Sequence, residues 1–239
     1  MARYLIAMIL LAAMPAAALA NADADRCYDI SVSDGDPDEG IAACSRAIES
    51  GGLADSKLAA AYTGRGLAYI AKESYNAAIK DFDAALKAVP DFEAAAINRG
   101  VARGLKGEFQ NALTDFDEVI EVDPFSARAH NGRCYTLAQM GKTDEALKAC
   151  ERAFKLDPNE PYILDSRGYA YFKSGDFRRA LADYDLALQI DPGKAKTLFS
   201  RGVTKLRLGN RDDGQRDLAA ARTLDSRIDR KMVRIGVVP

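Results

Sequence analysis

The feature that most constrains this sequence is a repeat of 34 residues. Proline recurs at this spacing at Pro90, Pro124, Pro158 and Pro192. A fixed period of this length is typical of a solenoid, in which each structural unit packs mainly against its neighbours. We therefore predict five repeats, with the bounds 59–92, 93–126, 127–160, 161–194 and 195–226.

Equivalent positions of the five repeats keep a similar side-chain size. Two positions are small, apart from cysteine in one copy: Gly66, Gly100, Cys134, Gly168 and Gly202, and then Ala78, Ala112, Ala146, Ala180 and Gly214. Four residues after the second small position comes a mostly bulky position: Phe82, Phe116, Cys150, Tyr184 and Leu218. Within each repeat the apolar positions recur at spacings of three and four, which indicates amphipathic helices. The small residues let two helices approach closely, and the bulky residue fills the space between them.

Turn signals divide each repeat into two helices. Gly107, Gly141 and Gly175 end the first helix, because glycine readily adopts the left-handed conformation that closes a helix. An Asp-Pro pair ends the second helix at Pro124, Pro158 and Pro192, since proline disfavours helix at the residue before it. The sequence therefore predicts an all-α fold of antiparallel helix pairs.

This arrangement of small, aromatic, small and proline positions resembles the tetratricopeptide repeat, and the resemblance extends from Ala59 to Arg227. It implies a right-handed superhelix whose first helices line a concave groove that binds peptides or proteins. The positions that the resemblance assigns to the groove form an apolar strip with aromatic and polar members. They are Leu67, Ile70, Ile97, Asn98, Val101, Leu105, Arg128, Asn131, Tyr135, Tyr162, Tyr169, Phe172, Phe199 and Val203. The alternative is that much of this strip only packs neighbouring helices.

Charged residues also follow the repeat. Arginine stands at Arg65, Arg99, Arg133, Arg167 and Arg201, and aspartate at Asp81, Asp115, Asp183 and Asp217. We interpret these residues as ion pairs between the two helices of a repeat, which set the register more than the stability. The third repeat has Ala149 in place of its aspartate. The alternative, a row of arginines for an anionic ligand, is weakened because the matched acids would neutralise them.

Both ends of the repeat array are predicted to be covered. Residues 21–58 are interpreted as a degenerate repeat that caps the array, and Asp36-Pro37 has the pattern of a helix start. Residues 227–239 are predicted to form a capping helix and a tail. Leu224, Ile228, Met232 and Ile235 supply its apolar spacing.

Residues 1–20 have the pattern of a secretory signal. Arg3 precedes the apolar stretch from Tyr4 to Met14, and Ala18-Leu19-Ala20 resembles a cleavage site. We therefore expect a mature chain that begins near Asn21, is exported, most simply to a periplasm, and has no stable membrane insertion. A membrane anchor is the alternative, but Pro15 interrupts a stretch that is already short for one.

Four cysteines fall into two pairs with similar spacings, Cys27 with Cys44 and Cys134 with Cys150. Three connectivities are possible in principle. Cys134 and Cys150 occupy facing positions of one helix pair, and Cys27 and Cys44 repeat nearly the same relation. We therefore predict the disulfides Cys27–Cys44 and Cys134–Cys150, as expected in an oxidising compartment.

Catalytic and cofactor chemistry is not indicated. The formal net charge is only -2, so no basic field favours nucleic acid. The only histidine, His130, shares a repeat position with Tyr62, Ala96, Leu164 and Leu198 and is expected to pack inside. We predict no enzyme, no metal and no cofactor, and propose a scaffold or adaptor that binds another protein in the groove. A chaperone for exposed hydrophobic segments and an enzyme acting on envelope polymers are the alternatives, and weak self-association is left open.

Overall fold

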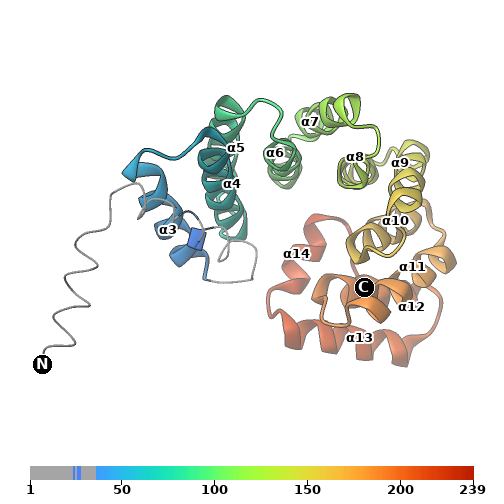
Figure 1. Cartoon of the computed structure of the whole chain (residues 1–239). Coiled ribbons are helices and arrows are strands. Elements are labelled where there is room, and N and C mark those ends of the chain that lie inside the picture. The colour runs from blue at the N-terminus through green and yellow to red at the C-terminus, as the bar shows by residue number, and fades with distance from the viewer. Residues whose placement is uncertain (1–23, 25, 28–35) are drawn as a thin grey trace, which may run out of the picture. The chain divides into compact units, whose positions relative to one another are not determined.

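The computed structural model describes residues 24, 26, 27 and 36–239, and the predicted signal peptide lies outside them. Within residues 36–239 the regular elements are all α-helices, which confirms the predicted fold class (Figure 1). The chain divides into two compact units, the first reaching Asp115 and the second beginning at Phe116.

Both units are built from successive helix pairs. The first unit contains α3 (Pro37–Ser50), α4 (Asp55–Ala71), α5 (Tyr75–Ala88), α6 (Glu93–Lys106) and part of α7 (Phe109–Val122). The second unit contains the rest of α7 and then α8 (Ala127–Gln139), α9 (Thr143–Leu156), α10 (Pro161–Ser174), α11 (Phe177–Ile190), α12 (Ala195–Arg207), α13 (Arg211–Leu224) and α14 (Ile228–Arg234). The first helices of the repeats are thus α4, α6, α8, α10 and α12, and the second helices are α5, α7, α9, α11 and α13.

The bulky residue of each repeat packs where the sequence places it. Phe82, Phe116, Cys150, Tyr184 and Leu218 are at most 1% exposed. The close approach requires a small residue opposite: a Cβ atom added at Gly168 would lie 2.8 Å from the Tyr184 ring. The predicted glycine turns are also present, and Gly175, for example, ends α10 with a φ of 81°.

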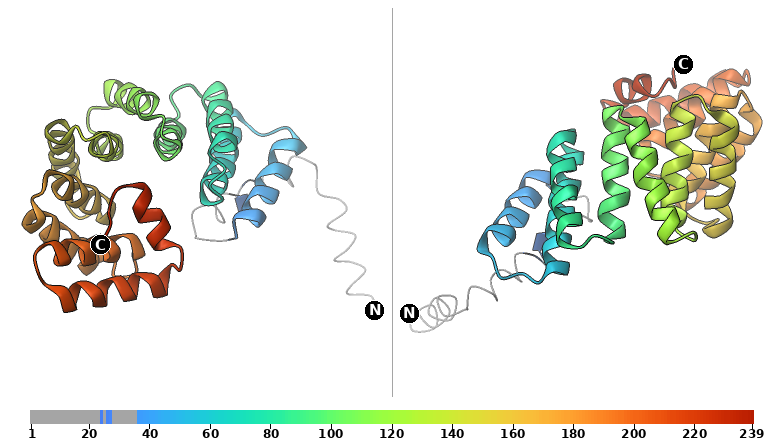
Figure 2. Two further views of the ribbon diagram at one scale, coloured as in Figure 1. Left: turned by 180° about the vertical axis from the view of Figure 1, so that it is seen from behind. Right: turned by 90° about the horizontal axis from the view of Figure 1, so that it is seen from above.

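The first helices lie closer together than the second helices. In the second unit α10 contacts both α8 and α12, whereas α9, α11 and α13 make no contact with one another among the described residues. In Figure 2 the first helices α8, α10 and α12 can be followed by colour, from green through yellow to orange. The stack of the second unit therefore curves toward its first helices, which form its inner face. In the first unit α4 and α6 are likewise in contact.

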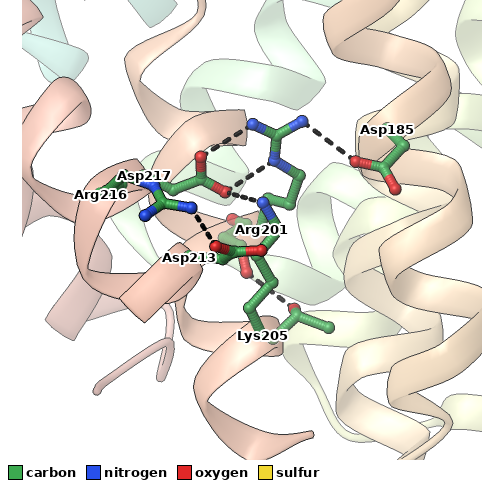
Figure 3. A network of polar contacts seen from close by, with 8 residues as sticks. Asp185, Arg201, Lys205, Asp213, Arg216 and Asp217 are labelled. Atoms are coloured by element: carbon green, nitrogen blue, oxygen red, sulfur yellow. Dashed lines mark hydrogen bonds and ion pairs between the residues drawn. The ribbon is translucent and has the colours of Figure 1, made fainter. Parts of the chain in front are cut away.

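The predicted arginine–aspartate pairs form in the four repeats that have the aspartate, and Arg99, Arg167 and Arg201 also contact an acid of the repeat before. Around Arg201, the Nε and Nη2 atoms donate to Asp217 at 2.7 and 2.8 Å, and Nη1 donates to Asp185 at 3.0 Å (Figure 3). Asp185 belongs to α11, the second helix of the preceding repeat. Arg201 thus joins three helices. Arg133, whose repeat lacks the aspartate, keeps the backward contact, to Asp117 at 2.8 Å.

Both ends of the described chain carry the predicted caps. The Asp36 side chain accepts a hydrogen bond from the Asp38 amide at 3.0 Å and starts α3. At the other end, Ile228 and Met232 of α14 are 2% and 1% exposed. The prediction was wrong for Leu224, which belongs to α13 and is 55% exposed, because the capping helix begins only after the turn at residues 225–227.

Both predicted disulfides are present. Cys27 is bonded to Cys44 of α3, and Cys134 of α8 is bonded to Cys150 of α9. All four cysteines are fully buried. In the third repeat a covalent bond therefore joins the two positions that elsewhere hold a glycine and a bulky side chain.

Candidate functional site

The residues assigned to the groove all lie on first helices, but their exposure differs between the two units. In the first unit Leu67 and Ile70 of α4 are half-buried, and Ile97 and Asn98 of α6 are buried. Two further residues of α6 face solvent: Val101 is 37% exposed and Leu105 is 46% exposed. Residues four apart share one face of a helix, so Val101 and Leu105 form one apolar surface.

In the second unit the predicted residues on α8 and at the start of α10 are also accessible. Arg128 is exposed, and Asn131 and Tyr135 are half-buried. Tyr162 is 40% exposed. These four residues combine aromatic and polar surface, unlike the aliphatic surface of the first unit.

The remaining four predicted residues are buried. Tyr169, Phe172, Phe199 and Val203 are between 0% and 9% exposed. The segment after α14, residues 235–239, lies against the two helices that carry them, and we call it the tail segment (Figure 1). These four side chains therefore offer no open surface in the structure.

Two hydrogen bonds hold the tail segment to the inner face. The Tyr169 hydroxyl of α10 donates to the Ile235 carbonyl at 2.7 Å. The Arg207 Nη2 atom of α12 donates to the Val238 carbonyl at 3.2 Å. Between them Val237 is fully buried. In the structure Val237 packs, while Val238 remains 40% exposed.

A polar cluster beside the tail segment was missed from the sequence. The Lys196 Nζ atom lies 3.0 Å from Asp165 Oδ2, and the Thr197 hydroxyl donates to Asp165 Oδ1 at 2.9 Å. The same ammonium group lies 4.3 Å from the centroid of the Tyr135 ring, a cation–π distance. The Tyr135 and Tyr169 rings pack with centroids 5.2 Å apart. This cluster joins α8, α10 and α12.

The charges in this cluster are stabilised by one another. Burial opposes the charged form of Lys196, but Asp165 and Tyr135 outweigh it and raise the pKa of the Lys196 ammonium group. Burial, together with Tyr135, raises the pKa of Tyr169 well above its usual value. The Tyr169 hydroxyl therefore stays protonated and able to donate a hydrogen bond.

The repeat register contained the signal for this cluster. Lys196 follows Tyr162 by one period, and Tyr162 follows Arg128 by another. Asp165 follows Asn131 by one period and precedes Phe199 by one period. Because four of these residues were already assigned to the groove, the same repeat positions indicate Asp165 and Lys196 as well.

The prediction for His130 was wrong. His130 is half-buried rather than packed inside, and its Nε2 atom lies 3.2 Å from the Pro124 carbonyl oxygen. Burial lowers its pKa. Among residues 24, 26, 27 and 36–239, no three His, Cys, Asp or Glu side chains are grouped to hold a metal ion. None of the helices in this described part has the length and apolarity to cross a membrane.

Comparison with protein families gives consistent matches along the chain. Models described as tetratricopeptide repeat match residues 127–160, residues 161–194, and the overlapping ranges 32–91 and 63–105. No curated protein sequence matches the chain significantly.

Solved structures share the fold at low sequence identity. TTC0263, a thermophilic tetratricopeptide repeat protein of Thermus thermophilus, matches with a TM-score of 0.65 and 19% identity, over 73% of this chain and 95% of its own. The pilF protein of Pseudomonas aeruginosa matches with a TM-score of 0.61 and 16% identity, over 90% and 99%. MamA from Desulfovibrio magneticus RS-1 gives 0.53 and 18%, over 72% and 97%. At these identities the likeness concerns the fold alone.

Proposed function

The chain belongs to the tetratricopeptide repeat family, and from this premise we propose that it is a non-catalytic scaffold or adaptor for protein–protein interaction in the periplasm. In this proposal a segment of another protein lies against the inner faces of the first helices. The general role in protein binding is inferred from the family, whereas the site of contact is inferred from the residues of this chain.

The observation that carries the proposal is the aliphatic surface of the first unit. A single exposed valine or leucine is ordinary in a folded protein. Here Val101 and Leu105 are exposed on one face of α6, and the half-buried Leu67 occupies the position of Val101 one repeat earlier. A few apolar anchors of this kind supply most of the affinity in protein interfaces.

The test replaces this surface without disturbing the helix. The variant Val101→Gln plus Leu105→Gln removes two exposed apolar side chains four residues apart on a first helix. Its matched control, Leu186→Gln plus Ile190→Gln, removes a pair with the same spacing and similar exposure, 44% and 50%, on the second helix α11. Each protein is used to capture partners from the native envelope fraction.

We expect the α6 variant to capture at least tenfold less of the partner, and the α11 control to capture the same amount as the unchanged protein. The proposal fails if both variants retain the partner equally, or if only the α11 variant loses it. Circular dichroism confirms that both variants remain helical.

A chaperone for exposed hydrophobic segments is the second candidate. It is favoured by the composition of the first-unit surface, where aliphatic side chains offer little to discriminate between sequences. The same capture experiment separates the two functions. An adaptor yields one or a few partners at fixed ratios, whereas a chaperone yields many unrelated unfolded proteins.

The periplasmic location is supported by the signal-like pattern of residues 1–20 and by the two disulfides, which are typical of oxidising compartments. Fractionation of a tagged chain should place it in the periplasmic fraction, with a mature N-terminus near Asn21. Alkylation without reductant should label no cysteine. A cytoplasmic chain with four labelled thiols would contradict this location.

A further inference from the structure

The tail segment has the characteristics of a bound peptide. Gly236 adopts a φ of 74°, so the chain turns after α14, and residues 237–239 have no regular secondary structure. Its contacts are those of a ligand in a groove: a backbone carbonyl accepts from Tyr169, a second carbonyl accepts from Arg207, and one aliphatic side chain, Val237, is fully buried.

The tail segment and the helix before it are held by different contacts. Ile228 and Met232 anchor α14, and Asp229 forms two hydrogen bonds with Arg222 of α13, at 2.7 and 2.8 Å. The tail segment is joined to α14 by the amides of Ile235, Gly236 and Val237, which donate to α14 carbonyls at 3.0 to 3.2 Å. Its contacts with the inner face are two hydrogen bonds through its own carbonyls, beside the buried Val237. Because α14 has anchors of its own, the tail segment can leave the inner face while α14 stays in place as the cap.

The chemistry of the inner face beneath the tail segment indicates which other ligand this surface can bind. Tyr169 is 1% exposed, and its hydroxyl is a buried donor beside the ring of Tyr135 on the inner face. A donor in such a setting needs an acceptor, because an unpaired buried polar group is unfavourable. A backbone carbonyl supplies that acceptor whatever the side chain, and the buried position of Val237 adds a preference for a branched aliphatic residue two positions later.

We propose that the inner face of α10 and α12 is a second peptide-binding site, that its ligand is an extended aliphatic segment of a partner protein, and that the tail segment is the resident occupant which this ligand displaces. The proposal deepens the function proposed above and rests on it. Because a tethered occupant acts at a high effective concentration, a partner segment must bind more tightly than the tail segment to replace it.

The test uses the tail sequence itself as the probe. A fluorescent peptide with the sequence of residues 234–239 is titrated into the full-length chain and into a variant that lacks residues 235–239, and binding is followed by anisotropy. We expect saturable binding to the shortened variant and at least tenfold weaker binding to the full-length chain. A peptide carrying Asp in place of Val237 should not bind.

Two further variants keep the result interpretable. Val237→Asp in the full-length chain releases the tail segment without shortening the chain, so it should also bind the probe. Tyr169→Phe in the shortened variant removes one hydrogen bond and should weaken binding about fivefold. The proposal is overturned if the shortened variant and the Val237→Asp variant are helical and bind no probe. It is also overturned if the full-length chain binds the probe as tightly as they do.

This titration uses no natural partner, so it is independent of the capture experiment on Val101 and Leu105. A chain that binds the probe but captures no protein would contradict the proposed scaffold function and keep the second site. A chain that captures its partner but never binds the probe would contradict the second site and keep the proposed scaffold function.

Discussion

The same repeat position differs in exposure between α6 of the first unit and α10 and α12 of the second. Val101 on α6 is 37% exposed, whereas its equivalents Tyr169 on α10 and Val203 on α12 are 1% and 0% exposed. The helices that carry these residues have the same length within one residue. In the second unit, however, α14 packs on α12, and the tail segment is hydrogen-bonded to α10 and α12. At Tyr169, therefore, a segment outside the repeats covers a hydroxyl that the repeat places on the inner face.

The two inner faces also differ in chemistry. The second unit places Asp165 and Lys196 in contact beside two tyrosine rings. The equivalent positions of the first unit, at Ile97 and Ala94, carry no charge. An aliphatic face can hold many sequences, whereas an ion pair with aromatic neighbours imposes a geometry on its ligand. We infer that the first unit supplies contact area and the second unit supplies selectivity.

The largest expected effect tests whether each unit depends to the same extent on its buried bulky residues. Phe82→Ala in the first unit and Tyr184→Ala in the second each empty a fully buried position between two helices. Each should lower the free energy of unfolding by about 3–5 kcal/mol, because a large side chain is lost and a cavity remains. Urea denaturation followed by circular dichroism measures both. If one variant costs less than about 1 kcal/mol, that unit relies on other contacts.

A smaller effect is expected from the arginine pairs, which differ within the second unit. Arg167 donates to Asp183 through two atoms, and the side chains are 11% and 5% exposed. Asp183→Ala should lower the free energy of unfolding by about 3 kcal/mol, since it leaves a largely buried guanidinium without its main partner. Arg133→Ala removes an exposed pair with Asp117 and should cost about 0–1 kcal/mol. Equal losses in the two variants would contradict this difference.

Acid should weaken the ion pair of the fifth repeat, between Arg201 and Asp217. Burial alone would raise the pKa of Asp217, but hydrogen bonds from Arg201 and Lys205 outweigh it and lower that pKa. A carboxylate whose pKa is lowered by folding stabilises the protein above its unfolded pKa of about 4, and this contribution is lost as the pH falls through the folded value. Asp217→Asn should therefore flatten the loss of stability below pH ~4 in an acid titration. An unchanged profile would show that other groups control acid unfolding.

The sequence predicted the parts of the structure that the repeat dictates. The glycine turns, the buried bulky residue and the arginine pairs follow from residues that recur every 34 positions, and both disulfides follow from two cysteine pairs of similar spacing. The contact of Tyr169 with the Ile235 carbonyl did not follow, because Ile235 belongs to no repeat. Lys196 and Asp165 were missed for a different reason. The groove was assigned mainly from apolar and aromatic residues, and these two charged residues were left out although their repeat positions match those of Arg128 and Asn131.

The smallest expected effect sharpens the comparison of the two faces most directly. Val203→Ala removes two methyl groups from a fully buried side chain and should lower the free energy of unfolding by about 2 kcal/mol. Val101→Ala makes the same chemical change on an exposed surface and should stay within about 0.5 kcal/mol. Urea denaturation of the two variants gives their free energies of unfolding. In partner capture we expect the opposite order of effects. Val101→Ala should weaken partner capture because its side chain is available for contact. A Val101→Ala variant that is strongly destabilised would mean that this face is covered in solution, and the distinction between an open and an occupied face would then be lost.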